Sequence, residues 1–268
     1  MTVIGASTHH HSVTLPGEDG AAIVLSWALD THTGYRRRHN EDSVIATPPI
    51  FAVADGMGGH SAGDVASKAV VTRLHELGGA GVTTAEAINA ALKAATVDIS
   101  FTEDQSQLGV GTTVTGIALV VQDDQPCWAV FNVGDSRVYL LERNKLVQVT
   151  VDHSVVQELV DAGMISASEA EHHPDSNIIT RAVGFNADPK TDFWLIPVRA
   201  GTRLLICSDG LTKEVDNNGI RQELAAGRSA EQSTGRLIDA ALAAGGRDNV
   251  TVLIVDVLES PTPEESDD

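Results

Sequence analysis

The stretch from Ile50 to His60 constrains the fold of this chain more than any other. Residues 50–54 are apolar or small and have the length of one strand, which predicts a buried β-strand. The strand ends at Asp55, and three glycines follow within four residues. Glycines there let the backbone turn tightly and let a ligand approach, because no Cβ is in the way. By itself the stretch fits a cation site or a hairpin turn, since Asp-Gly between apolar runs commonly marks a turn.

Other carboxylates occupy similar positions. Asp209 and Asp248 each lie where an apolar strand meets a glycine or polar turn, Glu41 and Asp42 precede a short strand, and Asp135 lies in a Gly-Asp turn. Oxygen ligands without cysteine or a paired-histidine helix favour Mg²⁺ or Mn²⁺ over zinc. Two such ions, about 3.5–4 Å apart, can activate a water for attack on phosphorus. Each aspartate alone fits a turn or helix cap, but the set favours a metal site.

Arg37 supplies the opposite charge close to Glu41 and Asp42 in the sequence. A guanidinium can hold two phosphate oxygens at once, so Arg37 is a candidate phosphate clamp. Together with the carboxylates, it points to phosphoryl chemistry.

The order of predicted elements indicates an α+β fold. Short turns between residues 114 and 148 imply antiparallel strands, and paired amphipathic helices can cover a sheet. We therefore expect a β-sandwich of two antiparallel sheets, flanked on both sides by antiparallel helix pairs. Strands are expected at 22–29, 43–46, 50–54, 114–121, 127–133, 137–142, 146–148, 191–197, 203–207 and 250–258. Longer helices are expected at 65–77, from 83 to about 95, at 216–225 and at 229–244. Thr83 and Glu86 are in capping-box register at the start of the second of these.

The chain divides into one domain and two ends. Residues 1–22 are polar and are predicted to form a flexible leader, and 23–258 form the domain. Residues 152–190 interrupt the strands with two short helical pieces and a polar loop, which is typical of a flap insertion. The pairs Ser154/Gln157 and Ser166/Glu169 are the expected caps of these two pieces. The acidic, proline-containing residues 259–268 are predicted to be a disordered tail.

The formal charge of −19 argues against nucleic acid or an anionic membrane as the main partner. Two cysteines in apolar runs suggest buried thiols, and no run is long enough to span a bilayer. The first residues lack the order of a signal peptide. We expect a cytoplasmic protein, with a monomer as the default.

Five motifs, taken in order, resemble the metal-dependent protein phosphatases (PPM, type 2C), and specifically their bacterial branch, over about residues 25–257. The resemblance implies a β-sandwich with a dinuclear Mn²⁺ or Mg²⁺ centre, and hydrolysis of phosphoserine and phosphothreonine without a phosphoenzyme. It also implies phosphorylated proteins as partners, namely Ser/Thr kinases or their targets. The motifs are Arg37-x-x-x-Glu41-Asp42, Asp55-Gly56-Met57-Gly58-Gly59-His60, Gly134-Asp135-Ser136-Arg137, Ser208-Asp209-Gly210-Leu211 and Arg247-Asp248-Asn249.

The resemblance also implies roles for the metal-site residues. Asp55 corresponds to the bridging ligand, with the Gly56 carbonyl beside it, and Asp209 and Asp248 correspond to ligands of the second metal. Asp135 corresponds to a ligand of a third, weaker ion.

Glu41 and Asp42 correspond to water-mediated ligands or to residues that orient the nucleophile, and Arg37 corresponds to the phosphate clamp.

The sequence departs from the family pattern at two positions. Many members have histidine directly after the first Asp-Gly, where this chain has Met57, so His60 becomes the candidate general acid. Family members also have an acidic residue four positions after the aspartate of the second Asp-Gly, here Asp209. This chain has Lys213 at that position, with Glu214 one place further on. The alternative to an enzyme is a non-catalytic phosphoprotein-binding regulatory module with the same fold. Mn²⁺-dependent release of phosphate from an aryl phosphate distinguishes the two.

Overall fold

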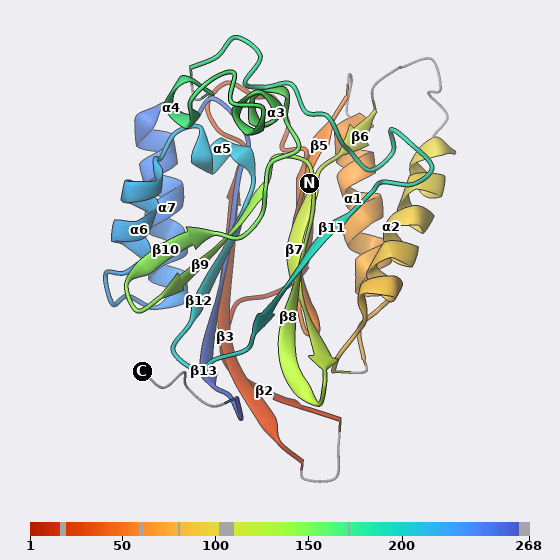
Figure 1. Cartoon of the computed structure of the whole chain (residues 1–268), viewed down its shortest axis with the longest axis vertical. Coiled ribbons are helices and arrows are strands. Elements are labelled where there is room, and N and C mark those ends of the chain that lie inside the picture. The colour runs from red at the N-terminus through yellow and green to blue at the C-terminus, as the bar shows by residue number, and fades with distance from the viewer. Residues whose placement is uncertain (17–19, 59–61, 80, 102–109, 171, 263–268) are drawn as a thin grey trace.

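The computed structural model describes residues 1–16, 20–58, 62–79, 81–101, 110–170 and 172–262. Two β-sheets lie face to face, and a pair of helices covers the outer face of each (Figure 1). The arrangement is the predicted α+β sandwich with helices on both sides.

The first sheet has seven strands. Its order is β1 (Thr2–Gly5), β4 (Asp42–Thr47), β5 (Ile50–Met57), β7 (Val114–Gln122), β8 (Gln125–Val133) and β11 (Asp192–Pro197), with β6 (Gly111–Thr112) paired to β5. Helices α1 (Ala62–His75) and α2 (Ala85–Ser100) pack on its outer face. A two-residue turn joins β7 to β8, and both its residues, Asp123 and Asp124, have positive φ. Such turns match the twist of paired strands, which fixes this hairpin locally.

The second sheet has six strands. Its order is β10 (Lys145–Gln148), β9 (Arg137–Glu142), β12 (Arg203–Cys207), β13 (Val250–Glu259), β3 (Ala22–His32) and β2 (Thr8–Thr14). Helices α6 (Asn217–Leu224) and α7 (Ala230–Ala244) cover its outer face. The one-turn helix α5 (Asp209–Thr212) follows β12 directly.

Residues 50–54 of strand β5 are apolar or small and are buried on both faces of the sheet. Phe51 and Val53 belong to the core between the two sheets, whereas Ile50, Ala52 and Ala54 pack in the core beneath α1 and α2. Burial on both faces explains why the sequence shows a continuous apolar run here and not an alternation.

An aromatic cluster forms the middle of the core between the sheets. Phe51 lies between Trp27 and Trp128, with ring centroids 5.2 and 6.2 Å away, and both contacts are edge-to-face. Each of the three side chains is at most 4% exposed. Because Trp27 comes from β3 and the other two from β5 and β8, these rings hold the two sheets together.

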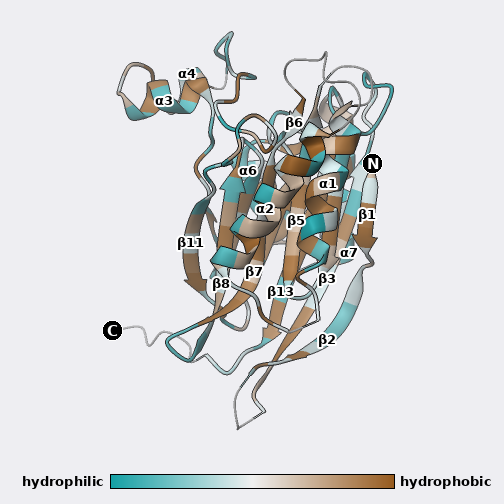
Figure 2. Ribbon diagram, turned by 90° about the vertical axis from the view of Figure 1, so that its right-hand side faces the viewer, coloured by the Kyte–Doolittle hydropathy of each residue, from teal (hydrophilic) through white to brown (hydrophobic). Residues whose placement is uncertain are grey.

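The insertion forms two short helices at one end of the sandwich. Helix α3 (Val155–Asp161) begins after Ser154, whose Oγ accepts a hydrogen bond from the Gln157 N–H, as predicted. Helix α4 (Ala167–Ala170) follows, and Ser166 and Glu169 exchange hydrogen bonds at its start. Figure 2 shows α3 and α4 standing apart from the stacked layers.

The prediction of a flexible leader is wrong for the described part of residues 1–22. Strand β1 pairs with β4 in parallel, so the first sheet is mixed and not purely antiparallel. Strand β2 pairs with β3, and the Trp27 indole N–H donates to the Ala6 carbonyl at 2.8 Å. These strands were not predicted. Both are edge strands, β1 has only four residues, and most exposed side chains of β2 are histidines.

Smaller differences concern single elements and their ends. Helix α2 is capped by Thr84 and not by Thr83, and α5 was not expected. Residue 259 belongs to β13, and Ser260 Oγ donates to the Val198 carbonyl, so the predicted disorder of the tail is wrong at its start. Residues 263–268 lie outside the described part.

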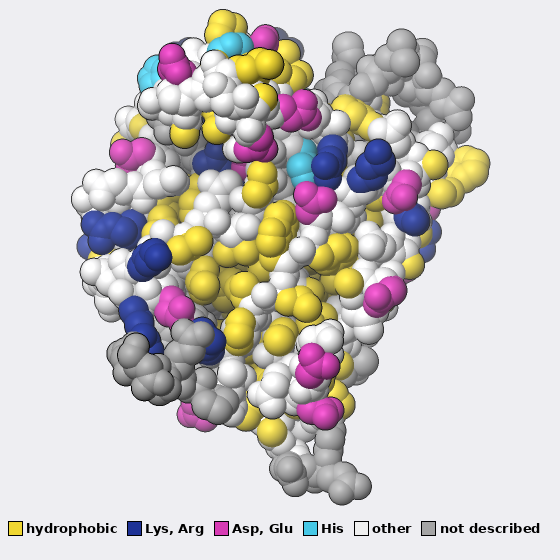
Figure 3. Space-filling view, in the orientation of Figure 1, with side chains coloured by type: hydrophobic (Ala, Val, Ile, Leu, Met, Phe, Trp, Pro, Cys, Tyr) yellow, Lys and Arg dark blue, Asp and Glu magenta, His cyan; other side chains and the backbone are white. Residues whose placement is uncertain are grey.

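The edge strands β10 and β11 lie on one side of the sandwich. Val147 in β10 and Leu195 in β11 are exposed hydrophobic residues, and Figure 3 shows hydrophobic side chains gathered over the middle of this face.

Among the described residues, no helix has the length and apolar character needed to cross a membrane.

Candidate functional site

Asp55 and Asp42 face each other across β5 and β4. Their Cα atoms are register partners in the antiparallel pair, which places their side chains on the same face of the sheet. Asp42 is fully buried; its Oδ2 accepts hydrogen bonds from Ser208 Oγ (2.9 Å) and Thr251 Oγ1 (2.5 Å). Its Oδ1 has no hydrogen-bond partner in the described part of the chain. Burial raises the pKa of Asp42 to about 7.

Thr112 and Thr113, just before strand β7, hold the backbone of Asp55 by hydrogen bonds. Its N–H donates to Thr113 Oγ1 at 3.1 Å, and its carbonyl accepts from Thr112 Oγ1 and from the Thr113 N–H, each at 2.9 Å. Thr113 Oγ1 also shares a 2.9 Å hydrogen bond with Ser136 Oγ, next to Asp135 in the sequence. This network fixes the position at which β5 delivers its carboxylate.

The carboxylates of Asp55, Asp42, Asp209, Asp135 and Asp248 are close enough to interact. Burial raises the pKa of Asp55 well above its ordinary value, and the negative charges of the other four raise it further, Asp42 most strongly. Hydrogen bonds join the segments that carry them, from Ser208 to Asp42 and from the Glu41 N–H to Asn249. The structure therefore gathers aspartates from five separate places in the sequence.

Gly56 permits this packing because no side chain fits at its position. A Cβ at Gly56 would lie 2.1 Å from the Gly63 carbonyl oxygen and 2.7 Å from the Glu41 carbonyl oxygen. A Cβ at Gly210 would lie 1.9 Å from the Asn249 carbonyl oxygen. Glycine at both positions lets the ends of neighbouring segments touch.

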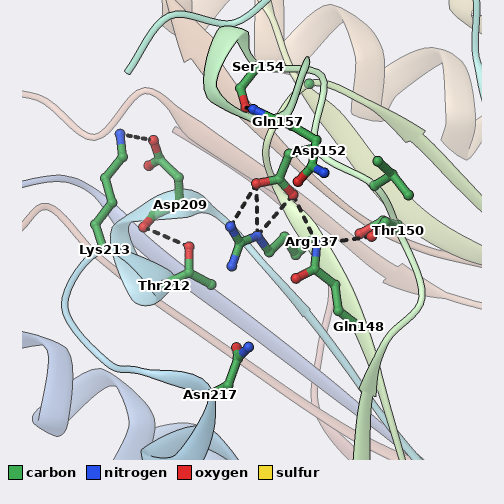
Figure 4. Close-up of polar contacts among 12 residues, drawn as sticks. Arg137, Gln148, Thr150, Asp152, Ser154, Gln157, Asp209, Thr212, Lys213 and Asn217 are labelled. Carbon is green, nitrogen blue, oxygen red and sulfur yellow. Dashed lines mark hydrogen bonds and ion pairs between the residues drawn. The ribbon is translucent and has the colours of Figure 1, made fainter. Parts of the chain in front are cut away.

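Asp209 opens helix α5 and pairs with a lysine. Its Oδ2 forms an ion pair with Lys213 Nζ, and its buried Oδ1 has no hydrogen-bond partner among the described residues (Figure 4). Asp135 is 8% exposed. Burial, followed by the charge of Asp209, raises the pKa of Asp135 to about 7.

Asp248 pairs with Arg37, whose Nη2 lies 2.7 Å from Asp248 Oδ2. The next residue, Asn249, anchors the loop that carries Arg37. Its Nδ2 donates to the carbonyls of Thr33 and His39, at 2.8 and 3.0 Å, and its Oδ1 accepts from the Glu41 N–H at 2.9 Å. Arg37 and Glu41 are thereby held beside the carboxylate group.

The donor set fits hard divalent cations. It consists of carboxylate and carbonyl oxygens, and two buried oxygens, Asp42 Oδ1 and Asp209 Oδ1, lack a protein partner in the described ranges. Within those ranges no three His, Cys, Asp or Glu side chains converge closely enough to hold a metal ion as they stand. Two of the carboxylates are instead paired with cationic side chains, Asp209 with Lys213 and Asp248 with Arg37.

Most of the predicted site residues come together, with two exceptions. His60 lies outside the described residues. The Glu214 side chain is 2% exposed and accepts hydrogen bonds from the Arg247 N–H and Nε, at 3.0 and 2.8 Å. It therefore pairs with Arg247 and not with the groups around Asp209. It does not replace the acid that the family pattern places at Lys213. Removal from water raises the pKa of Glu41 above its ordinary value, and the positive charge of Arg37 offsets only part of this rise.

The residues that support the carboxylates were not predicted as site residues. Ser208 and Asn249 stand inside the quoted motifs, so their positions were a usable signal. Thr251 and Thr113 carried no signal, because their partners are distant in the sequence.

Comparison with known proteins agrees with this geometry. A family model described as "Protein phosphatase 2C" matches residues 38–244 of this chain. The serine/threonine protein phosphatase PstP of Mycobacterium tuberculosis is 39% identical over 244 residues, which is 88% of this chain and 46% of PstP. The serine/threonine phosphatase Stp of Listeria monocytogenes is 38% identical over 239 residues, covering 84% of this chain and 93% of Stp. The chain belongs to the protein phosphatase 2C family.

Solved structures show the same fold. A crystal structure of the M. tuberculosis PstP/Ppp phosphatase superimposes with a TM-score of 0.78 at 37% identity, covering 88% of this chain and all of that one. The catalytic domain of PstP in complex with two manganese ions has a TM-score of 0.77 at 36% identity, with the same coverage. The chain thus spans the whole of these solved structures but about half the length of the curated M. tuberculosis relative.

Proposed function

We propose that this chain is a metal-dependent protein phosphatase that hydrolyses phosphoserine and phosphothreonine on proteins, with residues 23–258 as the catalytic domain. The observation that carries the proposal is the group of aspartate carboxylates around Asp55, with Arg37 beside it. Such a group needs positive charge, and a phosphate ester needs a guanidinium and divalent cations.

Two Mn²⁺ or Mg²⁺ ions are the proposed cofactors, because the donors are hard oxygens. Asp55, the Gly56 carbonyl, Asp209 and Asp248 would hold them, and Asp135 would contribute to a third, weaker site. The manganese ions in the related PstP structure support this assignment.

When bound, the two cations supply Lewis acidity, which makes water nucleophilic near neutral pH. Asp42 and Glu41 orient the attacking water through their carboxylate oxygens. Arg37 binds the phosphate oxygens, and its half-exposed side chain is accessible from solvent. The leaving serine or threonine oxygen needs a proton, and His60 remains the candidate general acid. The water oxygen forms a bond to phosphorus as the bond between phosphorus and the serine or threonine oxygen breaks, so inorganic phosphate is released and no phosphoenzyme is formed.

The proposed substrates are phosphorylated proteins, because the M. tuberculosis and Listeria relatives are named serine/threonine phosphatases. We further propose Ser/Thr kinases or their targets as the partners, met in the cytoplasm by a monomer. The net charge of −19 disfavours nucleic acid and anionic membranes as partners.

A metal-dependence assay tests the proposal. The protein should release phosphate from a phosphothreonine peptide and from p-nitrophenyl phosphate with Mn²⁺, and should lose this activity in EDTA. Asp55→Asn and Asp209→Asn should abolish turnover, since each removes a charged ligand. Asp239→Asn, on the exposed face of α7, is the matched control and should behave as the unchanged protein.

Two results would count against an enzyme. Phosphopeptide binding without turnover at any metal concentration would favour the binding-module alternative. Full activity in EDTA would reject the metal mechanism.

A further inference from the structure

Helix α5 places a lysine on a carboxylate of the proposed metal site. The helix starts at Asp209 and ends at Thr212, and Lys213 is its C-cap, one helical turn after Asp209. The Lys213 backbone N–H donates to the Asp209 carbonyl at 2.8 Å, and Nζ pairs with Asp209 Oδ2. An i, i+4 spacing brings two side chains onto the same helix face, so this contact follows from the local backbone.

The Lys213 ammonium lies beside the carboxylate group and is largely shielded from solvent. The Lys213 side chain is 34% exposed and that of Asp209 is 12% exposed. The ordinary pKa of lysine lies well above 7, so the Lys213 ammonium is positively charged at neutral pH.

The segment that bears Lys213 is also held in place. The Lys213 carbonyl accepts from Arg247 Nη2 at 3.2 Å, and Glu214 accepts from Arg247 Nε at 2.8 Å. Arg247 directly precedes Asp248, so these bonds tie the end of α5 to the loop of a second proposed ligand. The backbone thus presents the ammonium to Asp209 from a defined position.

We propose that Lys213 is a positioning residue that acts as the internal counter-ion of Asp209 and competes with a divalent cation for its carboxylate. The inference rests on the proposed metal-dependent function and goes beyond it, because it predicts how tightly the site binds metal. An ammonium and a metal ion repel each other, and both need the same carboxylate oxygens. Lys213 therefore weakens the binding of the ion that Asp209 contacts and stabilises the fold at low metal concentration.

Neutralising the lysine tests this directly. Lys213→Met removes the charge and keeps the chain length, and Lys213→Arg keeps the charge. Lys93→Met is the matched control. Lys93 lies on helix α2 and forms an exposed ion pair with Asp188 at 3.5 Å, so its loss removes the same charge outside the carboxylate group. The whole chain is stripped with EDTA and titrated with Mn²⁺ by calorimetry, and its unfolding temperature is measured with and without Mn²⁺.

We expect K213M to bind Mn²⁺ about tenfold more tightly than the unchanged protein, a change that corresponds to about 1.4 kcal/mol. In EDTA, K213M should unfold at a lower temperature, because Asp209 loses its counter-ion, and Mn²⁺ should raise that temperature by more than in the unchanged protein. K213R and K93M should match the unchanged protein in Mn²⁺ affinity.

An equal or weaker Mn²⁺ affinity in K213M would overturn the proposal, as would a K213R variant that behaves like K213M. If K213M does not fold, Lys213→Gln removes the same charge with a polar side chain and must give the same tighter binding. The proposed function fails separately: it fails if neither the unchanged protein nor K213M binds Mn²⁺, whereas the counter-ion proposal fails when both bind equally.

Discussion

Replacing Asp42 by asparagine should stabilise this protein in the absence of metal, although Asp42 belongs to the proposed catalytic group. Burial raises the pKa of Asp42 from its ordinary 3.8 to about 7. Between these two values, the folded protein keeps a proton that the unfolded chain releases. Stability therefore falls as pH rises from about 4 to 7, and the loss is complete above pH 7.

The size of the effect follows from the structure. A pKa difference of about three units corresponds to about 4 kcal/mol of stability lost at pH 8. An asparagine oxygen can still accept the hydrogen bonds from Ser208 and Thr251. Its NH₂ group takes the place of Oδ1, which has no partner among the described residues, and this costs about 1–3 kcal/mol. D42N should therefore gain about 1–3 kcal/mol at pH 8.

Urea unfolding in EDTA at several pH values between 5 and 8 measures this gain, with D239N as the control for loss of an exposed carboxylate. The gain should grow with pH up to about 7 and then level off. Added Mn²⁺ should shrink or reverse it, because a cation favours the ionised carboxylates around it.

A D42N gain that is the same at every pH, or a loss of stability at pH 8 in EDTA, would refute the assignment of a raised pKa to Asp42. A gain that is unaffected by Mn²⁺ would refute its place beside a metal.

Three further predictions concern other parts of the molecule. Arg37→Ala should raise the KM for a phosphopeptide about ten- to hundredfold, as loss of a charge-assisted hydrogen bond of about 1.5–3 kcal/mol implies, with less effect from Arg36→Ala. Arg137→Met leaves Asp152, 9% exposed, without the bidentate partner seen in Figure 4, and should cost about 3 kcal/mol in urea unfolding. Replacing residues 174–177 in the insertion by Gly-Ser should lower kcat/KM for a phosphopeptide more than for p-nitrophenyl phosphate, which has no peptide to contact.

Each of these predictions has an outcome that contradicts it. Equal effects of R36A and R37A would remove the clamp assignment from Arg37. If D152N added to R137M restores no stability, the unpaired charge is not the cause of the loss. Equal effects on both substrates would leave residues 174–177 as a surface loop without a role in substrate binding.

Local patterns were enough to predict much of the fold. Strands β9 and β12 were predicted to the residue, and the caps of α3 and α4 were predicted from Ser154 and Ser166. Each of these signals depends on neighbours within a few positions, where apolar runs, glycine turns and capping side chains act. Strands β1 and β2 carried no such signal, because their positions depend on strands β4 and β3, with which they pair.

The sequence by itself determined which carboxylates are candidates for the site. Asp55, Asp209 and Asp248 each follow or precede an apolar strand at a turn, and that placement is visible without a structure. Their order and spacing were also enough to indicate the family, which the match over residues 38–244 confirms.

Only the tertiary structure decided how these carboxylates are held. Asp42 accepts from Ser208 and Thr251, which are 166 and 209 positions away, and Asp248 pairs with Arg37 across 211 positions. The contact of Lys213 with Asp209 is local, but it needs the one-turn helix α5, whose four residues are too few for a periodic pattern to reveal. Charges and burial act through space, so the raised pKa values of Asp42, Asp55 and Asp135 and the partner of each carboxylate depend on how the two sheets pack.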